Sequence, residues 1–100
     1  MIQITKYKNK IQIKGHSMPD VCASVSSVVY TWVNMVKTVI DENAIDFEDN
    51  TKEDYILITI KSRKKSIKQS IFVLLSMFVD IQEQAPKGCV EVHVLDMEDK

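Results

Sequence analysis

The stretch MIQITKYKNKIQIKG, residues 1–15, is the part of the sequence that best indicates the fold. Apolar side chains recur at every second position in each half of it: Ile2 and Ile4, then Ile11 and Ile13. A period of two is typical of a strand that buries one face. The polar tripeptide 8–10 separates the halves, so the stretch predicts a two-stranded hairpin that ends at Gly15.

Two segments with helical spacing of their apolar residues follow the hairpin. Ser17, Pro19 and Asp20 favour a helix start. The apolar positions after them keep helical spacing to about Ile40: Val21, Val25, Val28, Trp32, Val36 and Val39. A second helix is predicted over residues 65–84, before Pro86 and Gly88, with these inward positions: Ile67, Ile71, Leu74, Phe78 and Ile81.

Three more strands complete the pattern. Residues 45–47 predict a short strand, residues 55–60 a clearer one after a turn at 49–52, and residues 90–94 a last one. The polar tail at 96–100 is expected to be frayed. The order β-β-α-β-β-α-β predicts one α+β domain over residues 1–100, a two-layer structure with two helices on one face of a mostly antiparallel sheet.

The composition excludes several classes of protein. With 13 basic and 14 acidic side chains the net charge is −1, so no overall field favours nucleic acid or membrane, and direct binding to either is not expected. We recognise no signal peptide and no apolar run of about 20 residues, and therefore expect a cytoplasmic protein. In that compartment the two cysteines are expected to be free thiols.

The stretch GHSMPDVCASVSS, residues 15–27, carries the one candidate for chemistry. Cysteine attacks as its thiolate, which a nearby imidazole or a helix N-terminus favours, and His16 and the helix start offer both to Cys22. Ser26 falls one helical turn after Cys22, on the same face. Asp20 could cap the helix or orient His16. Equally, Cys22 could be a small core residue and His16 an ordinary loop histidine.

At these residues the chain resembles the ribosomal-processing cysteine proteases. Gly15-His16 stands where that family has a Gly-His at a strand end, and residues 21–26, VCASVS, stand where it has Val-Cys-Ala-small-Val-Ser at a helix start. The match continues at Thr31 and Asn34 and returns at residues 81–86, IQEQAP, before the last strand.

The resemblance implies a homodimeric α+β enzyme without a cofactor or metal. It would remove the N-terminal extension of a large-subunit ribosomal protein, number twenty-seven, cutting after a short apolar segment that contains Phe. By resemblance Cys22 is the nucleophile and His16 the general base and acid. Gly15, Asp20 and Ser26 would be supporting or substrate-binding residues.

The chain departs from the family pattern in two places. The loop between His16 and Cys22 is shorter, and Asp20 stands one place nearer to the cysteine. Two other functions therefore stay open: a non-catalytic homologue that binds the ribosome or a ribosomal protein, and a redox-sensing thiol protein.

Other features carry weaker expectations. Apolar residues left over on the second helix could line a homodimer contact: Phe72, Leu75 and Val79. A basic cluster at 61–68 and an acidic segment at 41–54 are interpreted mainly as solvated turns. Cys89 and His93 offer too few ligands for zinc, so Cys89 is interpreted as a structural thiol.

Overall fold

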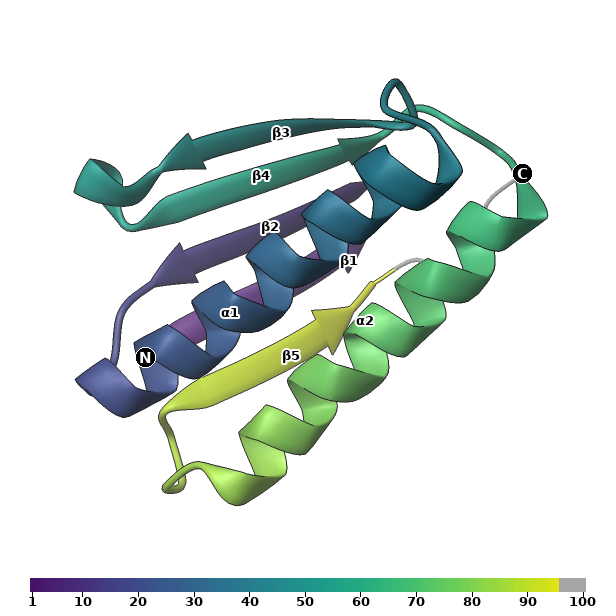
Figure 1. Cartoon of the computed structure of the whole chain (residues 1–100). Coiled ribbons are helices and arrows are strands. Elements are labelled where there is room, and N and C mark those ends of the chain that lie inside the picture. Colours follow the sequence, from purple (N-terminus) through teal and green to yellow (C-terminus); the bar gives the residue numbers. More distant parts are fainter. Residues whose placement is uncertain (96–100) are drawn as a thin grey trace.

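The computed structural model describes residues 1–95, and the tail at 96–100 that we expect to be frayed lies outside them. The elements follow the predicted order (Figure 1). They are β1 (Ile2–Tyr7), β2 (Lys10–Gly15), α1 (Pro19–Met35), the π-helical turn η1 (Val36–Ile40), β3 (Ile45–Asn50), the 3-10 turn η2 (Thr51–Glu53), β4 (Tyr55–Ile60), α2 (Lys65–Gln84) and β5 (Val90–Val94).

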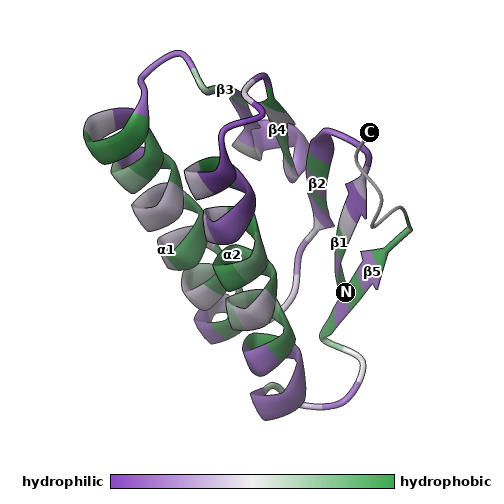
Figure 2. Ribbon diagram, turned by 90° about the vertical axis from the view of Figure 1, so that its right-hand side faces the viewer, coloured by the Kyte–Doolittle hydropathy of each residue, from purple (hydrophilic) through white to green (hydrophobic). Residues whose placement is uncertain are grey.

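The five strands form one sheet in the order β3-β4-β2-β1-β5. The pairs β1–β2, β2–β4 and β3–β4 are antiparallel, whereas β5 joins β1 in parallel. Both helices lie against the same face of the sheet, and no helix of residues 1–95 covers the other face (Figure 2). The predicted α+β class and its element order are therefore confirmed.

The core lies between the sheet and the helices. In the hairpin Ile4 pairs with Ile13, and both side chains are buried. Opposite them the helices bury Val29 from α1 and Phe78 from α2. The indole N–H of Trp32 donates a hydrogen bond of 3.0 Å to the carbonyl oxygen of Ser70, which joins α1 to α2 inside the core. No helix within residues 1–95 has the length and apolar character needed to cross a membrane.

The inward positions of the first helix differ in part from the prediction. Val29 and Val33 are buried, whereas Val28 is only half-buried and Val39 is 73% exposed. The α-helical hydrogen bonding ends at Met35, and the wider π-helical turn that follows changes the angle between successive side chains. Val36 therefore stays in the core while Val39 turns to solvent.

The turn predicted at residues 49–52 is also displaced. The strand β3 continues to Asn50 because it keeps pairing with β4, whose first residue, Tyr55, lies opposite Asn50. The chain reverses in η2 and in Asp54, whose φ is 53°. As a result Asp54, and not a residue near Asn50, directly precedes β4.

Candidate active site

The candidate site lies where β2 ends and α1 begins. Gly15 is the last residue of β2 and His16 follows it directly. Pro19 opens α1, so Cys22 falls in the first turns of the helix. The amide N–H of Cys22 donates a hydrogen bond of 3.0 Å to the carbonyl oxygen of Met18, so that amide is already part of the helix. The strand end and the helix start thus hold the imidazole and the thiol on one short connection.

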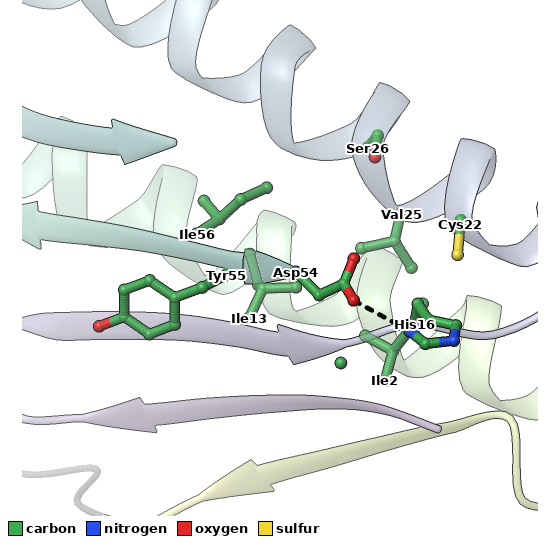
Figure 3. A pocket seen from close by; sticks show the side chains of 10 residues that line it. Ile2, Ile13, His16, Cys22, Val25, Ser26, Asp54, Tyr55 and Ile56 are labelled. Carbon is green, nitrogen blue, oxygen red and sulfur yellow. Dashed lines mark hydrogen bonds and ion pairs between the residues drawn. The ribbon is translucent and has the colours of Figure 1, made fainter. Parts of the chain in front are cut away.

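Four of the five sequence-predicted site residues line one hollow of about 110 Å³ (Figure 3). Gly15, His16, Cys22 and Ser26 contribute to its wall, together with six residues of the strands, the helix and the β3–β4 turn: Ile2, Ile13, Val25, Asp54, Tyr55 and Ile56. The hollow is therefore largely apolar, with a thiol, an imidazole and a carboxylate at its edge.

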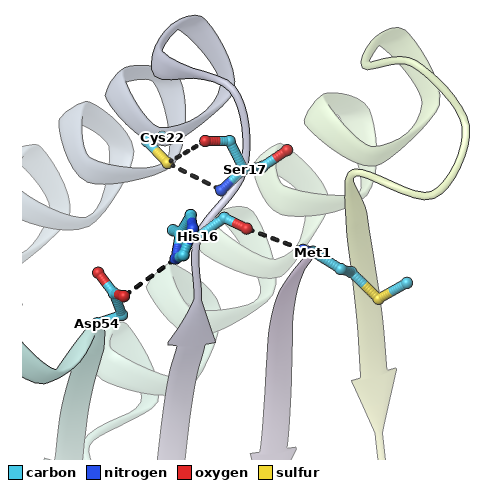
Figure 4. Close-up of polar contacts among 5 residues, drawn as sticks. All are labelled: Met1, His16, Ser17, Cys22 and Asp54. Atoms are coloured by element: carbon cyan, nitrogen blue, oxygen red, sulfur yellow. Dashed lines mark hydrogen bonds and ion pairs between the residues drawn. The ribbon is translucent and has the colours of Figure 1, made fainter.

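The half-buried thiol of Cys22 contacts the main chain of Ser17 (Figure 4). The amide N–H of Ser17 donates to Sγ over 3.2 Å, and the carbonyl oxygen of Ser17 lies 3.4 Å from Sγ, where it can accept the S–H proton. Ser17 therefore offers the sulfur one donor and one acceptor, and both hold the thiol against the loop.

The ring of His16 contacts a carboxylate instead of the thiol. Its Nδ1 lies 3.0 Å from Oδ2 of Asp54, with 74% of the His16 side chain and 49% of the Asp54 side chain exposed. In both close-up views the ring lies between the Asp54 carboxylate and the Cys22 sulfur (Figure 3 and Figure 4). The three groups thus stand in the order carboxylate, imidazole, thiol.

Gly15 has a steric reason to be glycine. Its φ is +97°, and a Cβ built on it would lie 2.2 Å from the carbonyl oxygen of Met1. The amino group of Met1 in turn donates a hydrogen bond of 2.8 Å to the carbonyl oxygen of His16. The main chain on both sides of the Gly15–His16 bond is therefore closely packed against the N-terminus.

Asp20 lies apart from the hollow. It lines a second depression, between the start of α1 and the end of α2, together with Asp80 and Gln84. The helix N-cap is Met18, and no side chain caps it. The carboxylate that contacts the His16 ring is therefore that of Asp54, and not that of Asp20.

Sequence reasoning missed Asp54 because 38 positions separate it from His16. A local pattern cannot give the register of two strands that are distant in the sequence. The available signal was indirect: an aspartate directly before the strand at 55–60 can meet the end of β2 only if those two strands pair antiparallel.

Neither the basic cluster at 61–68 nor the second thiol, Cys89, lines the hollow. Within the basic cluster, Lys61 lies 3.3 Å from Asp46 and Lys64 lies 3.6 Å from Asp41, which joins it to the acidic segment. Cys89 is a free thiol, as is Cys22, and is half-buried ahead of β5. Within residues 1–95, no three His, Cys, Asp or Glu side chains gather as metal ligands would.

Comparisons of sequence alone give no relative. The chain matches no protein-family model, and no curated protein matches it.

Comparison of structures gives close likenesses. The essential ribosomal processing protease Prp of Staphylococcus aureus, solved with a covalently linked product peptide, superposes with a TM-score of 0.79 at 16% identity, over 93% of this chain and 96% of that one. The same protease with a substrate peptide gives 0.78 at 14% identity over the same shares of the two chains, 93% and 96%. SMU.848 of Streptococcus mutans gives 0.77 at 20% identity, over 94% and 96%. The chain therefore has the fold of Prp.

Proposed function

We propose that this chain is a cysteine endopeptidase that processes a ribosomal protein precursor. The observation that carries the proposal is that His16 and Cys22, which come from a strand end and a helix start, line one hollow. The fold likeness to a ribosomal processing protease solved with peptides supports the same reaction class. We propose as substrate the tailed form of large-subunit ribosomal protein twenty-seven, and the cytoplasm as the place of reaction.

The proposed reaction needs only the two side chains and water. His16 takes the proton of the Cys22 thiol, and the sulfur attacks the scissile carbonyl carbon to form a C–S bond. The C–N bond then breaks, and His16 gives its proton to the leaving amine. Water next attacks the thioester and loses a proton to His16. The C–S bond then breaks, the N-terminal fragment leaves as a carboxylic acid, and His16 returns the proton to the sulfur.

The walls of the hollow support a substrate with an apolar residue near the cut. Ile13, Val25 and Ile56 give it an apolar lining beside the thiol. Such a lining favours an aromatic or aliphatic side chain, because its burial removes apolar surface from water. We propose that Ser26, which lines the hollow one turn beyond Cys22, hydrogen-bonds a peptide that lies along the helix start.

Incubation with the tailed precursor, read by intact mass spectrometry, tests this function. The wild-type protein should release the extension as one fragment, Cys22→Ala should release none, and Cys89→Ala should behave as wild type. An uncut precursor after incubation with the wild-type protein would refute the proposal for this substrate.

One observation favours a second function, a homologue that binds the precursor or the ribosome without cutting. The amide N–H and the carbonyl oxygen of Ser17 engage the Cys22 sulfur, an arrangement that a binding site without a nucleophile would tolerate. A binder would retain the precursor intact in a pull-down with either wild type or Cys22→Ala.

We further propose that the enzyme is a homodimer that uses the outer face of α2. Phe72 is 68% exposed and Val79 is 39% exposed on that helix, whereas Leu75, which the sequence also offers for the contact, is half-buried against the core. Exposed apolar side chains that gather on one helix face are typical of a contact between subunits.

A further inference from the structure

We propose that Asp54 is a positioning residue, which holds the imidazole of His16 with Nε2 free to take the thiol proton. This inference rests on the proposed peptidase function and adds a third member to the pair that the sequence predicts.

The proton on the ring follows from the contact itself. Nδ1 of His16 lies 3.0 Å from Oδ2 of Asp54. An ionised carboxylate can only accept hydrogen bonds, so Nδ1 must carry the hydrogen. In a neutral imidazole the other nitrogen, Nε2, then has the free lone pair that a general base needs. When the ring gains a proton in the reaction, the same carboxylate faces a positive charge and stabilises it.

The main chain fixes the place of the carboxylate. The amide N–H of Gly15 donates a hydrogen bond of 2.9 Å to the carbonyl oxygen of Asp54. This bond continues the β2–β4 pairing one step beyond the pair Lys14–Tyr55. Asp54 is thus joined through its main chain to the residue before His16 and through its side chain to the His16 ring.

The conformation of Asp54 fits this role. Its φ of 53° lies in the left-handed region, where aspartate and asparagine are tolerated better than most residues. Because the pair is largely exposed, it contributes little to the free energy of unfolding. Orientation of the ring, and not stability, is what this contact provides.

Two substitutions separate the side chain from the backbone. Asp54→Gly removes the carboxylate at a φ that glycine adopts freely, so strain does not confuse the result. Asp54→Asn keeps an oxygen that can accept the Nδ1 hydrogen but removes the charge. The chain holds only two histidines, and His93, whose Nε2 lies 3.1 Å from Oε1 of Glu91, serves as the internal control.

The first measurement is the imidazole tautomer, read from long-range ¹H–¹⁵N NMR spectra at a pH where both rings are neutral. His16 should carry its hydrogen on Nδ1 and His93 on Nε2. Asp54→Gly should move the His16 hydrogen largely to Nε2 and leave His93 unchanged, and Asp54→Asn should keep more of the wild-type tautomer. A His16 tautomer that is the same in wild type and Asp54→Gly would overturn the inference.

The second measurement is the rate of precursor cleavage. Asp54→Gly should lower kcat at least about tenfold with little change in KM, and Asp54→Asn should recover part of the loss. Full kcat in Asp54→Gly would also overturn the inference. A wild-type protein with the expected tautomer that cuts no precursor would refute the peptidase function alone, while supporting Asp54 as the residue that orients His16.

Discussion

The amide nitrogen of Gly15 lies 2.9 Å from the carbonyl oxygen of Asp54, and this one bond joins the strand end that carries His16 to the turn before β4. The two residues have φ values of 97° and 53°, both in the left-handed half of backbone space. The geometry of the site therefore depends on the backbone conformation of Gly15 and Asp54.

Gly15→Ala tests that dependence. A Cβ at Gly15 meets a backbone oxygen at 2.2 Å, whereas a Cβ at Gly88, which has a φ of +86°, meets nothing within 4 Å. Gly88→Ala should therefore lower the free energy of unfolding by about 1 kcal/mol, from backbone strain alone. Gly15→Ala should lower it further, as measured by urea denaturation. Equal losses in the two variants would show that the N-terminal strand yields freely to the added methyl group.

The phenylalanines of α2 test the assignment of the core. Phe78 is fully buried and Phe72 is 68% exposed, although both belong to one helix. Phe78→Ala should lower the free energy of unfolding by about 3–5 kcal/mol, because it leaves a cavity under the sheet. Phe72→Ala should lower it by less than about 1 kcal/mol in the monomer. A large loss at Phe72 at low protein concentration would contradict the packing described here.

Phe72 also tests the proposed dimer. Phe72→Asp should move the protein from dimer to monomer in light scattering after size-exclusion chromatography, since a charge there would be buried at the contact. Val39→Asp, at a residue that is 73% exposed on the other helical segment, is the matched control and should leave the dimer intact. If the Phe72→Asp variant remains a dimer, the two subunits contact each other at another surface.

Asp41 gives the protein a pH-dependent contribution to stability. The backbone N–H of Asn43, with smaller effects of Lys64 and Lys61, lowers the pKa of Asp41 below its ordinary value of 3.8. A lowered pKa in the folded state stabilises the protein above that ordinary value and ceases to do so as the pH falls through the folded pKa. Wild type should therefore exceed Asp41→Asn in stability near neutral pH, and the difference should shrink in acid. An unchanged difference between about pH 5 and pH 2 would contradict this.

The sequence predicted the fold well because its pattern is local. The alternation of Ile2, Ile4, Ile11 and Ile13 specifies the hairpin, and the helix at 65–84 has the bounds that its spacing predicts. Both follow from side chains a few positions apart. The bounds of the β3–β4 turn and the parallel pairing of β5 with β1 depend on distant strands, and only the structure supplied them.

The site was predicted only in part, for the same reason. His16 and Cys22 lie close in sequence, so a short loop sufficed to bring them to one hollow. The sequence offers the near residue Asp20 as one candidate for a carboxylate beside His16, whereas in the structure Asp54, directly before the neighbouring strand β4, contacts the ring.

The rate at which Cys22 is alkylated tests the central claim most directly, because only an ionised sulfur reacts quickly. Cys22 and Cys89 are both free and half-buried, so each protein carries its own control. The account predicts that at neutral pH iodoacetamide modifies Cys22 at least about tenfold faster than Cys89, and that His16→Ala removes most of this advantage. Equal rates at the two cysteines, or an advantage that His16→Ala leaves intact, would contradict it.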